Sequence, residues 1–278
     1  MKNNFYKTEK MDGGVLITAD FDFSLADTLE CGQCFRFFKT DSGYEGVTRG
    51  KRLVLEQREN ALFIGGIDIN EADFWAEYFG LDINYREFHS RIVKNDILKQ
   101  SASAAKGIRI LKQDFFETLL SFIFSQNNNI PRIKKIVENF CRLFGEEIEN
   151  GVFAFPTPDR LKDVKIEDLA PLKCGFRDKY IISAATAVID GRVTEERINA
   201  LDFEDAKALL MTIKGVGEKV ADCVLLFGCN RLEAFPKDVW IKRVMAEIMP
   251  NGLPAELQDI AGIAQQYLFH YARNLKTE

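Results

Sequence analysis

Short apolar runs separated by turn signals mark the first hundred residues of the chain. β-branched and aromatic residues fill the runs at 14–18, 34–38 and 52–56, and polar or glycine-containing turns at 40–43 and 49–51 lie between them. Such residues favour extended backbone, and runs bounded by turn residues are typical of strands that hairpins connect. The pattern therefore predicts an antiparallel sheet in the N-terminal part of the chain.

From Asp114 onward the apolar positions follow the spacing of helices. Asp114, with Glu117 three residues later, has the pattern of a helix start and predicts a helix over 115–126. Pro131 suits the first turn of a second helix that ends before Gly145, because the missing N–H of proline costs nothing there. The remainder of the chain continues as helices with short loops.

Neither repeats nor a low-complexity linker interrupts the 278 residues, of which 46% are hydrophobic. This supplies enough apolar surface for one large core or two smaller ones. We predict an α+β fold, in which an N-terminal antiparallel sheet domain over 1–105 packs on a mainly α-helical domain over 106–278. No apolar run approaches the roughly 18 residues that span a bilayer, and the first residues lack the apolar centre of a signal peptide.

A glycine-containing turn joins two predicted helices at about 203–228. Asp202 stands at the N-cap position of the first helix, whose apolar residues continue to Ile213, and the second helix begins near Glu218. The turn between them consists of Gly215, Val216 and Gly217. Glycine lets the backbone approach a ligand closely, and the N–H groups at a helix start attract anions. The segment therefore predicts a helix-hairpin-helix that binds phosphate.

Two chemically active side chains follow this hairpin. Lys219 lies in the first turn of the second helix, and Asp238 comes nineteen residues later, beyond a loop that contains Pro236. Taken singly, they are consistent with a surface lysine and with an N-cap for a helix that starts at Val239. Their joint order, with the glycine hairpin before them, resembles the helix-hairpin-helix, Gly/Pro, Asp superfamily of DNA glycosylases.

Within that superfamily the chain resembles the 8-oxoguanine DNA glycosylases, in a bacterial branch. The similar segments follow the order of the family over nearly the whole chain, at 30–36, 107–111, 121–123, 126–130, 174–177, 214–223 and 261–265. No cysteine follows Cys229, so the C-terminal iron–sulfur cluster of the endonuclease III and adenine-glycosylase branches is missing. The resemblance implies a bifunctional DNA N-glycosylase and AP lyase that excises 8-oxoguanine from double-stranded DNA.

The resemblance also assigns the chemistry. It implies that Lys219 attacks the anomeric carbon of the sugar, forms a Schiff base and cleaves the strand by β-elimination. Asp238 then stabilises the developing oxocarbenium charge and handles protons. The base has to leave the duplex before it can be reached, which requires a pocket and a plug for the gap.

Further site residues follow from the same resemblance. In the base pocket, the Gly32 carbonyl reads the N7 hydrogen of the oxidised base, Cys223 and Phe269 form the walls, and Gln265 reads the Watson–Crick edge. The residues implied to fill the gap and contact the opposite cytosine are Asn127, Arg132, Phe176 and Arg177. From the residues alone, 127–129 also fits a polar turn, and the two phenylalanines also fit ordinary core packing.

Three residues depart from the eukaryotic pattern of this family. Trp240 stands where those relatives have a histidine near a phosphate, Phe176 replaces a tyrosine, and Phe227 occupies a position that is often methionine. Two other functions stay open: a noncatalytic helix-hairpin-helix DNA-binding module, and a glycosylase for another damaged purine. Lys219 argues against both, because a pure binder needs no lysine there and glycosylases for alkylated bases generally work without one.

The cysteines and the charge give weaker signals. Cys31 and Cys34 have the spacing of a zinc or redox motif, but no second pair or histidine cluster accompanies them, so we expect neither a metal nor a cofactor. Whether a monovalent cation completes the hairpin stays open. The net charge of −5 argues mildly against a DNA partner, whereas the stretches 106–112 and 132–135 are basic. We expect a monomer in the cytoplasm with the chromosome, or in the nucleus of a eukaryote.

Overall fold

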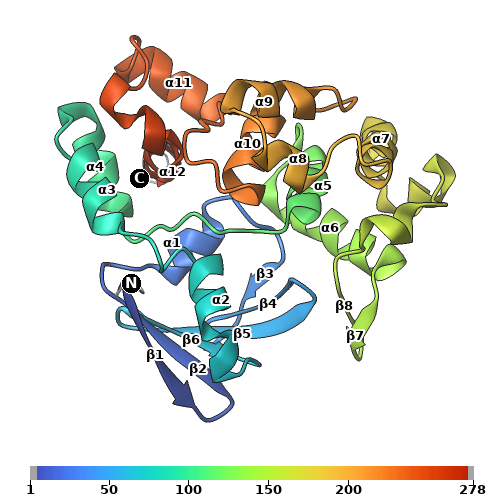
Figure 1. The fold of residues 1–278 in the computed structure, drawn as a ribbon, viewed down its shortest axis with the longest axis horizontal. Coiled ribbons are helices and arrows are strands. Elements are labelled where there is room, and N and C mark those ends of the chain that lie inside the picture. The colour runs from blue at the N-terminus through green and yellow to red at the C-terminus, as the bar shows by residue number, and fades with distance from the viewer. Residues whose placement is uncertain (1–4, 275–278) are drawn as a thin grey trace.

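The computed structural model describes residues 5–274, which form a sheet with helices stacked at one end of it (Figure 1). The sheet has six antiparallel strands in the order β1-β2-β6-β5-β4-β3. Their bounds are β1 (Tyr6–Met11), β2 (Gly14–Ala19), β3 (Phe37–Lys39), β4 (Tyr44–Thr48), β5 (Lys51–Arg58) and β6 (Ala61–Gly65). The predicted antiparallel sheet is confirmed. Sequence reasoning missed β4, β6 and β1, and the mostly exposed, charged residues of β1 are typical of an edge strand.

The predicted strand at 34–38 is wrong over most of its length. Helix α1 (Leu25–Glu30) precedes a bent loop, and β3 begins only at Phe37. The cause is Gln33, which is fully buried and donates hydrogen bonds from Nε2 to the carbonyls of Thr28 and Arg109, each at 2.8 Å. A buried amide that is paired in this way holds the backbone away from the sheet.

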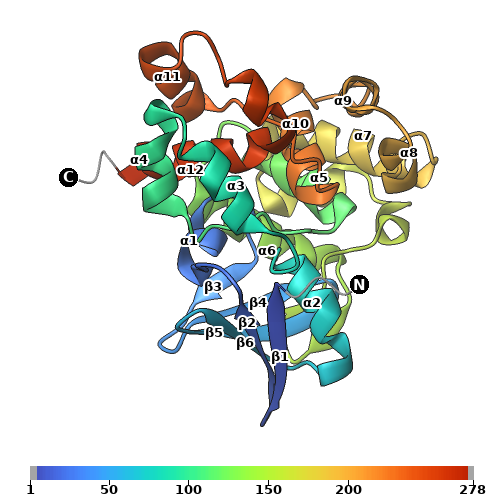
Figure 2. The same ribbon diagram turned by 60° about the vertical axis from the view of Figure 1, so that its left-hand side comes forward.

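Helices also replace the expected strand pattern after Gly65. They are α2 (Ala72–Tyr78), α3 (Tyr85–Ile92) and α4 (Asp96–Ala105). Helix α2 lies against the sheet, and Trp75 is part of the sheet core. Helices α3 and α4 instead lie beside the C-terminal helices (Figures 1 and 2), and Leu98 belongs to the helical core. A domain boundary between residues 105 and 106 stays a prediction.

The helical part begins with two helices that the sequence predicts to within one residue. These are α5 (Phe115–Ser125) and α6 (Ile130–Phe144), and Asp114 caps α5 by accepting a hydrogen bond from the Glu117 N–H at 2.9 Å. The later helices are α7 (Asp178–Ile189), α8 (Glu195–Asn199), α9 (Phe203–Met211), α10 (Glu218–Gly228), α11 (Val239–Ile248) and α12 (Ala261–Asn274). A two-stranded hairpin, β7 (Glu147–Glu149) and β8 (Val152–Phe153), follows α6. Short 3-10 helices lie at Ile69–Glu71, Pro158–Leu161, Ile166–Leu172, Gly175–Arg177 and Ala255–Ile260.

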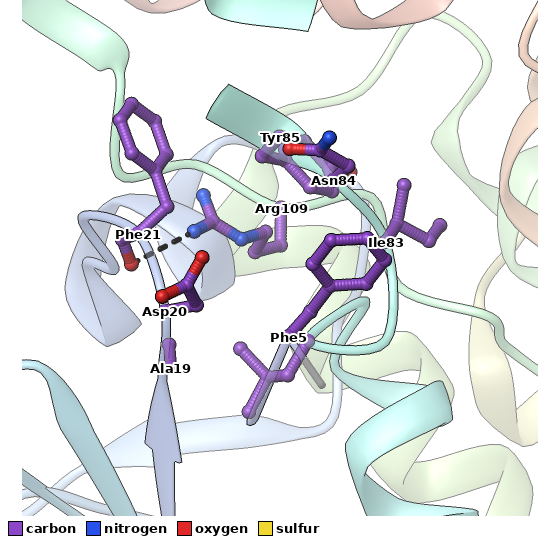
Figure 3. A pocket seen from close by; sticks show the side chains of 9 residues that line it. Phe5, Ala19, Asp20, Phe21, Ile83, Asn84, Tyr85 and Arg109 are labelled. Carbon is purple, nitrogen blue, oxygen red and sulfur yellow. Dashed lines mark hydrogen bonds between the residues drawn. The ribbon is translucent and has the colours of Figure 1, made fainter. Parts of the chain in front are cut away.

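A buried arginine joins the sheet to the helices. Arg109 is 2% exposed, and its guanidinium donates to the carbonyl of Phe21 and lies 4.3 Å from the centroid of the Tyr85 ring (Figure 3). It also donates to the carbonyl of Asp22. The loop that it holds leads directly into α1. Because α1 carries the following loop with Gly32, Arg109 helps to fix the position of that loop. In the part of the chain that the structure describes, no helix is long and apolar enough to cross a membrane.

Candidate active site

A groove of about 690 Å³ and a smaller recess of about 50 Å³ meet between the two parts of the molecule. They share Gly32, Phe122, Lys219, Asp238 and Phe269 as lining residues. The recess adds Cys223 and Gln265. The fold thus brings both residues of the expected catalytic pair and all four residues of the expected base pocket to one place, from four separate segments of the chain.

The hairpin lies between α9 and α10, as predicted. Gly215 has φ +92°, and the Val216 N–H donates to the carbonyl of Ile213 at 3.0 Å to close the turn. Gly217 occupies the N-cap position of α10 and supplies no side-chain cap, whereas Asp202 caps α9. The first N–H groups of α10 therefore have no side-chain acceptor from the N-cap, which is the arrangement that attracts a phosphate oxygen.

Lys219 is half-buried in the first turn of α10. Its Nζ atom lies 4.8 Å from the centroid of the Phe122 ring on α5. One turn further on, Cys223 is buried, and burial raises the pKa of its thiol to about 11 although the adjacent Lys219 acts in the opposite direction. The amine thus stands at the mouth of the recess between an aromatic face and a protonated thiol. Phe122 lies in segment 121–123, one of those that resemble the family, but the sequence does not indicate its contact with Lys219.

Asp238 is fixed by the helix that it begins. It is the N-cap of α11, and its Oδ1 atom accepts a hydrogen bond from the Ile241 N–H at 2.8 Å. This confirms the N-cap that the sequence predicts. A negatively charged group at the start of a helix also interacts favourably with the helix dipole. Since Asp238 also lines the recess, a negative charge faces the same space as Lys219.

The loop after α1 and helix α12 form further walls of the recess. Gly32 has φ +80°, and a Cβ atom there would lie 3.6 Å from Cε1 of Phe269, so the two residues are closely packed. Gln265 is buried and accepts a hydrogen bond at Oε1 from Nε2 of Gln266 at 2.8 Å. The buried Oε1 of Gln266 has no hydrogen-bond partner among the described residues. Sequence reasoning missed Gln266, whose only signal was a second polar residue within an apolar helix.

The four residues expected at the opposite base lie around the end of α5. Asn127 is exposed with φ +47°, Arg132 is exposed at the start of α6, and Phe176 is 52% exposed. Arg177 is buried and donates to the carbonyls of Gln126, Asn127 and Cys174. Burial and the nearby Arg132 lower the pKa of Arg177. The structure therefore brings these residues near one another, with one arginine exposed and the other bound to backbone.

The charge of the groove differs from that of the whole chain. Among the described residues that line it, the charged ones are Lys219, Lys237, Lys242, Arg273 and Asp238. Four cations and one anion give a positive surface although the net charge of the chain is −5. Such a local excess is the distribution that attracts a phosphate backbone. No cluster of acidic, histidine or cysteine side chains suited to a metal ion is found within residues 5–274.

Two family models match adjacent parts of the chain. Residues 15–119 match the N-terminal domain of 8-oxoguanine DNA glycosylase. Residues 120–252 match the HhH-GPD superfamily of base excision DNA repair proteins. The first match contains Gly32 and the sheet apart from β1 and the first residue of β2, and the second contains the hairpin, Lys219 and Asp238.

Individual proteins show the same likeness. The chain is 30% identical to the N-glycosylase/DNA lyase of Saccharomyces cerevisiae over 262 residues, which cover 83% of the chain and 69% of that protein. It is 30% identical to the N-glycosylase/DNA lyase of Arabidopsis thaliana over 257 residues, which cover 87% of the chain and 68% of that protein. The Clostridium acetobutylicum 8-oxoguanine glycosylase/lyase, crystallised with double-stranded DNA containing cytosine opposite 8-oxoguanine, is 34% identical with a TM-score of 0.89. That match covers 99% of this chain and 100% of the crystallised one.

Proposed function

Because the chain belongs to the 8-oxoguanine DNA glycosylases of the HhH-GPD superfamily, we propose that it excises 8-oxoguanine from duplex DNA and cleaves the strand at the resulting abasic site. It is a DNA-repair glycosylase with AP lyase activity. One observation carries the assignment of the chemistry to residues: Lys219, in the first turn of the helix that follows the glycine hairpin, and Asp238 line the same recess. An amine and a carboxylate in one recess suit excision by nucleophilic attack.

The proposed reaction begins with Nζ of Lys219 as the neutral amine. Nζ attacks C1′ of the sugar while the C1′–N9 bond breaks, and the electron pair leaves with the base, which takes up a proton. The carboxylate of Asp238 stabilises the positive charge that develops on the sugar. Nζ then loses one of its two protons, and its electron pair forms the C1′=Nζ bond while the C1′–O4′ bond breaks. O4′ takes up a proton, which leaves an open-chain sugar joined to Lys219 as a protonated Schiff base. Removal of a C2′ proton then expels the 3′ phosphate, and no metal or cofactor takes part.

Recognition of the base is assigned to the other lining residues of the recess. The carbonyl of Gly32 would accept the N7 hydrogen that oxidised guanine has and guanine lacks. Cys223 and Phe269 would enclose the two faces of the base, and Gln265 would contact its Watson–Crick edge. The unpaired Oε1 of Gln266 lies next to Gln265 and supports this proposal, since a buried acceptor without a donor is costly unless a ligand supplies one.

DNA binding is assigned to the hairpin and to the positive groove. One copy of the chain supplies both the hairpin and the groove, so we propose that the protein acts as a monomer. We also propose that it is located with the chromosome. A monovalent cation at the hairpin remains part of this proposal, with backbone carbonyls of the turn as its ligands. The carbonyl of Gly215 already accepts a hydrogen bond from Nε2 of Gln126 at 3.0 Å. The cation would therefore be bound by the other carbonyls of the turn.

The direct test is excision from a duplex with one modified base. The protein is expected to release 8-oxoguanine opposite cytosine and to nick the strand without added alkali, and to leave an unmodified duplex intact. Release of an alkylated purine but not of 8-oxoguanine would favour a different damaged base. Specific binding without release of either base would favour the noncatalytic DNA-binding module.

Opposite-base preference gives a second prediction. Arg132→Ala is expected to slow excision opposite C roughly 10- to 100-fold more than excision opposite A, because a lost hydrogen bond from a charged donor costs about 1.5–3 kcal/mol. Arg177→Ala is expected to lower the same preference. Single-turnover rates on the two duplexes measure the effect, with Lys135→Ala as a control for loss of an exposed cation on α6. Equal slowing opposite C and opposite A would show that the arginines hold DNA without reading the base.

A further inference from the structure

The turn of the hairpin is held from two sides at Gly215. A Cβ atom added to Gly215 would overlap Cγ, Cδ1 and Cδ2 of Tyr180, so the face of this ring lies directly on the glycine α-carbon. On the carbonyl side, Nε2 of Gln126 donates to the Gly215 oxygen at 3.0 Å. With φ +92° as well, the turn has a conformation and a surrounding that only glycine fits.

The same two residues also contact the segments expected at the opposite base. The Tyr180 ring, on α7, lies 5.7 Å from the Phe176 ring, centroid to centroid, at an angle of 67°. The carbonyl of Gln126 accepts a hydrogen bond from Nε of Arg177 at 2.9 Å, and Gln126 directly precedes Asn127. Tyr180 and Gln126 thus connect the glycine hairpin, which would bind a phosphate, with Asn127, Phe176 and Arg177, which would fill or border the gap in the duplex.

We propose that Gln126 and Tyr180 form a clamp that fixes the position of the hairpin relative to Asn127 and Phe176. The clamp rests on the proposed function, in which the hairpin holds one strand by its phosphates while the gap residues contact the other strand. Those contacts form together only if the two elements keep a fixed separation, and small displacements in such a site are costly. In this proposal Tyr180 is a positioning residue: its ring supports the hairpin and does not itself bind DNA.

The contacts of Tyr180 give the proposal a sharp test. Packing on Gly215 and Phe176 uses the ring alone, so Tyr180→Phe should keep the clamp, and Tyr180→Leu should lose it. Gln126→Ala removes the hydrogen bond to Gly215 without leaving a core cavity, and it tests the same clamp if Tyr180→Leu folds poorly. Tyr6→Leu in β1, where the hydroxyl donates to Asp73, is the matched control in the sheet.

Duplex affinity is measured with an 8-oxoguanine:C duplex at several salt concentrations, each variant being combined with Lys219→Gln to prevent turnover. We expect Tyr180→Leu to weaken binding about tenfold, equivalent to about 1.4 kcal/mol. The slope of log K against log salt should become shallower by about one unit, as for the loss of one phosphate contact. Gln126→Ala should reduce the slope in the same direction, and Tyr180→Phe and Tyr6→Leu should leave affinity and slope unchanged.

Two results would overturn the clamp. Weaker binding of folded Tyr180→Leu protein with an unchanged salt slope would show that the ring only stabilises the fold. An unchanged slope in Gln126→Ala would show that its hydrogen bond does not position the hairpin. Failure of the proposed function has a different signature, since the otherwise unaltered protein would then neither excise 8-oxoguanine nor prefer the damaged duplex.

Discussion

Replacing Lys219 with glutamine is expected to abolish the covalent protein–DNA adduct that borohydride traps on an 8-oxoguanine duplex. Glutamine keeps much of the length and polarity of the side chain but has no amine to attack C1′, so base release and strand cleavage should both fall by at least about 10³-fold. Duplex binding should remain measurable, because the hairpin N–H groups are backbone groups that the substitution does not remove. Gel analysis of the reduced mixture measures the adduct, and titration with labelled duplex measures binding.

A lysine elsewhere in the groove provides the control for this experiment. Lys237 also lines the groove and is exposed, but it lies outside the recess. Lys237→Gln should weaken DNA binding and still give the adduct at saturating duplex. An undiminished adduct in Lys219→Gln would place the nucleophile on another residue. If both Lys219→Gln and Lys237→Gln lost the adduct at saturating DNA, the loss would reflect impaired binding. The experiment would then not identify Lys219 as the nucleophile.

Local patterns explain what the sequence could predict. The bounds of α10 and the N-caps Asp114, Asp202 and Asp238 depend on residues within three or four positions of each other, and all agree with the structure. The order of the hairpin, Lys219 and Asp238 is also local. These features carry the family resemblance, so the function could be inferred before the site was seen.

Tertiary contacts explain what the sequence could not predict. Residues 34–36 have the composition of a strand, but the buried amide of Gln33 binds carbonyls of Thr28 and Arg109, the second 76 positions away. Likewise, a charged side chain such as Arg177 is ordinarily exposed, but here it donates a hydrogen bond to the carbonyl of Gln126, 51 positions earlier in the chain. Such pairings depend on how elements pack, and no periodicity in the sequence encodes them. The individual roles of the recess residues stay predictions, and substitutions of Lys219 and Asp238 test the two catalytic ones.

Asp238→Asn is expected to slow base release about 10²- to 10³-fold while the fold persists. The substitution removes the negative charge that would stabilise the oxocarbenium ion, an electrostatic contribution of that order in other enzymes. Stability should change by no more than about 1 kcal/mol, because asparagine caps helices nearly as well as aspartate. Single-turnover release of 8-oxoguanine and thermal unfolding measure the two effects separately.

Asp202→Asn is the matched control for the capping role of Asp238. Asp202 caps α9 through Oδ1 and the Asp205 N–H at 2.9 Å, nearly the geometry of Asp238 and Ile241, but it is exposed and does not line the recess. Both substitutions should therefore lower the unfolding temperature by similar small amounts, and only Asp238→Asn should slow base release. If the two variants released the base at the same rate, or if Asp238→Asn unfolded the protein, the carboxylate would be serving α11 as a cap and the charge that assists base release would have to come from another group.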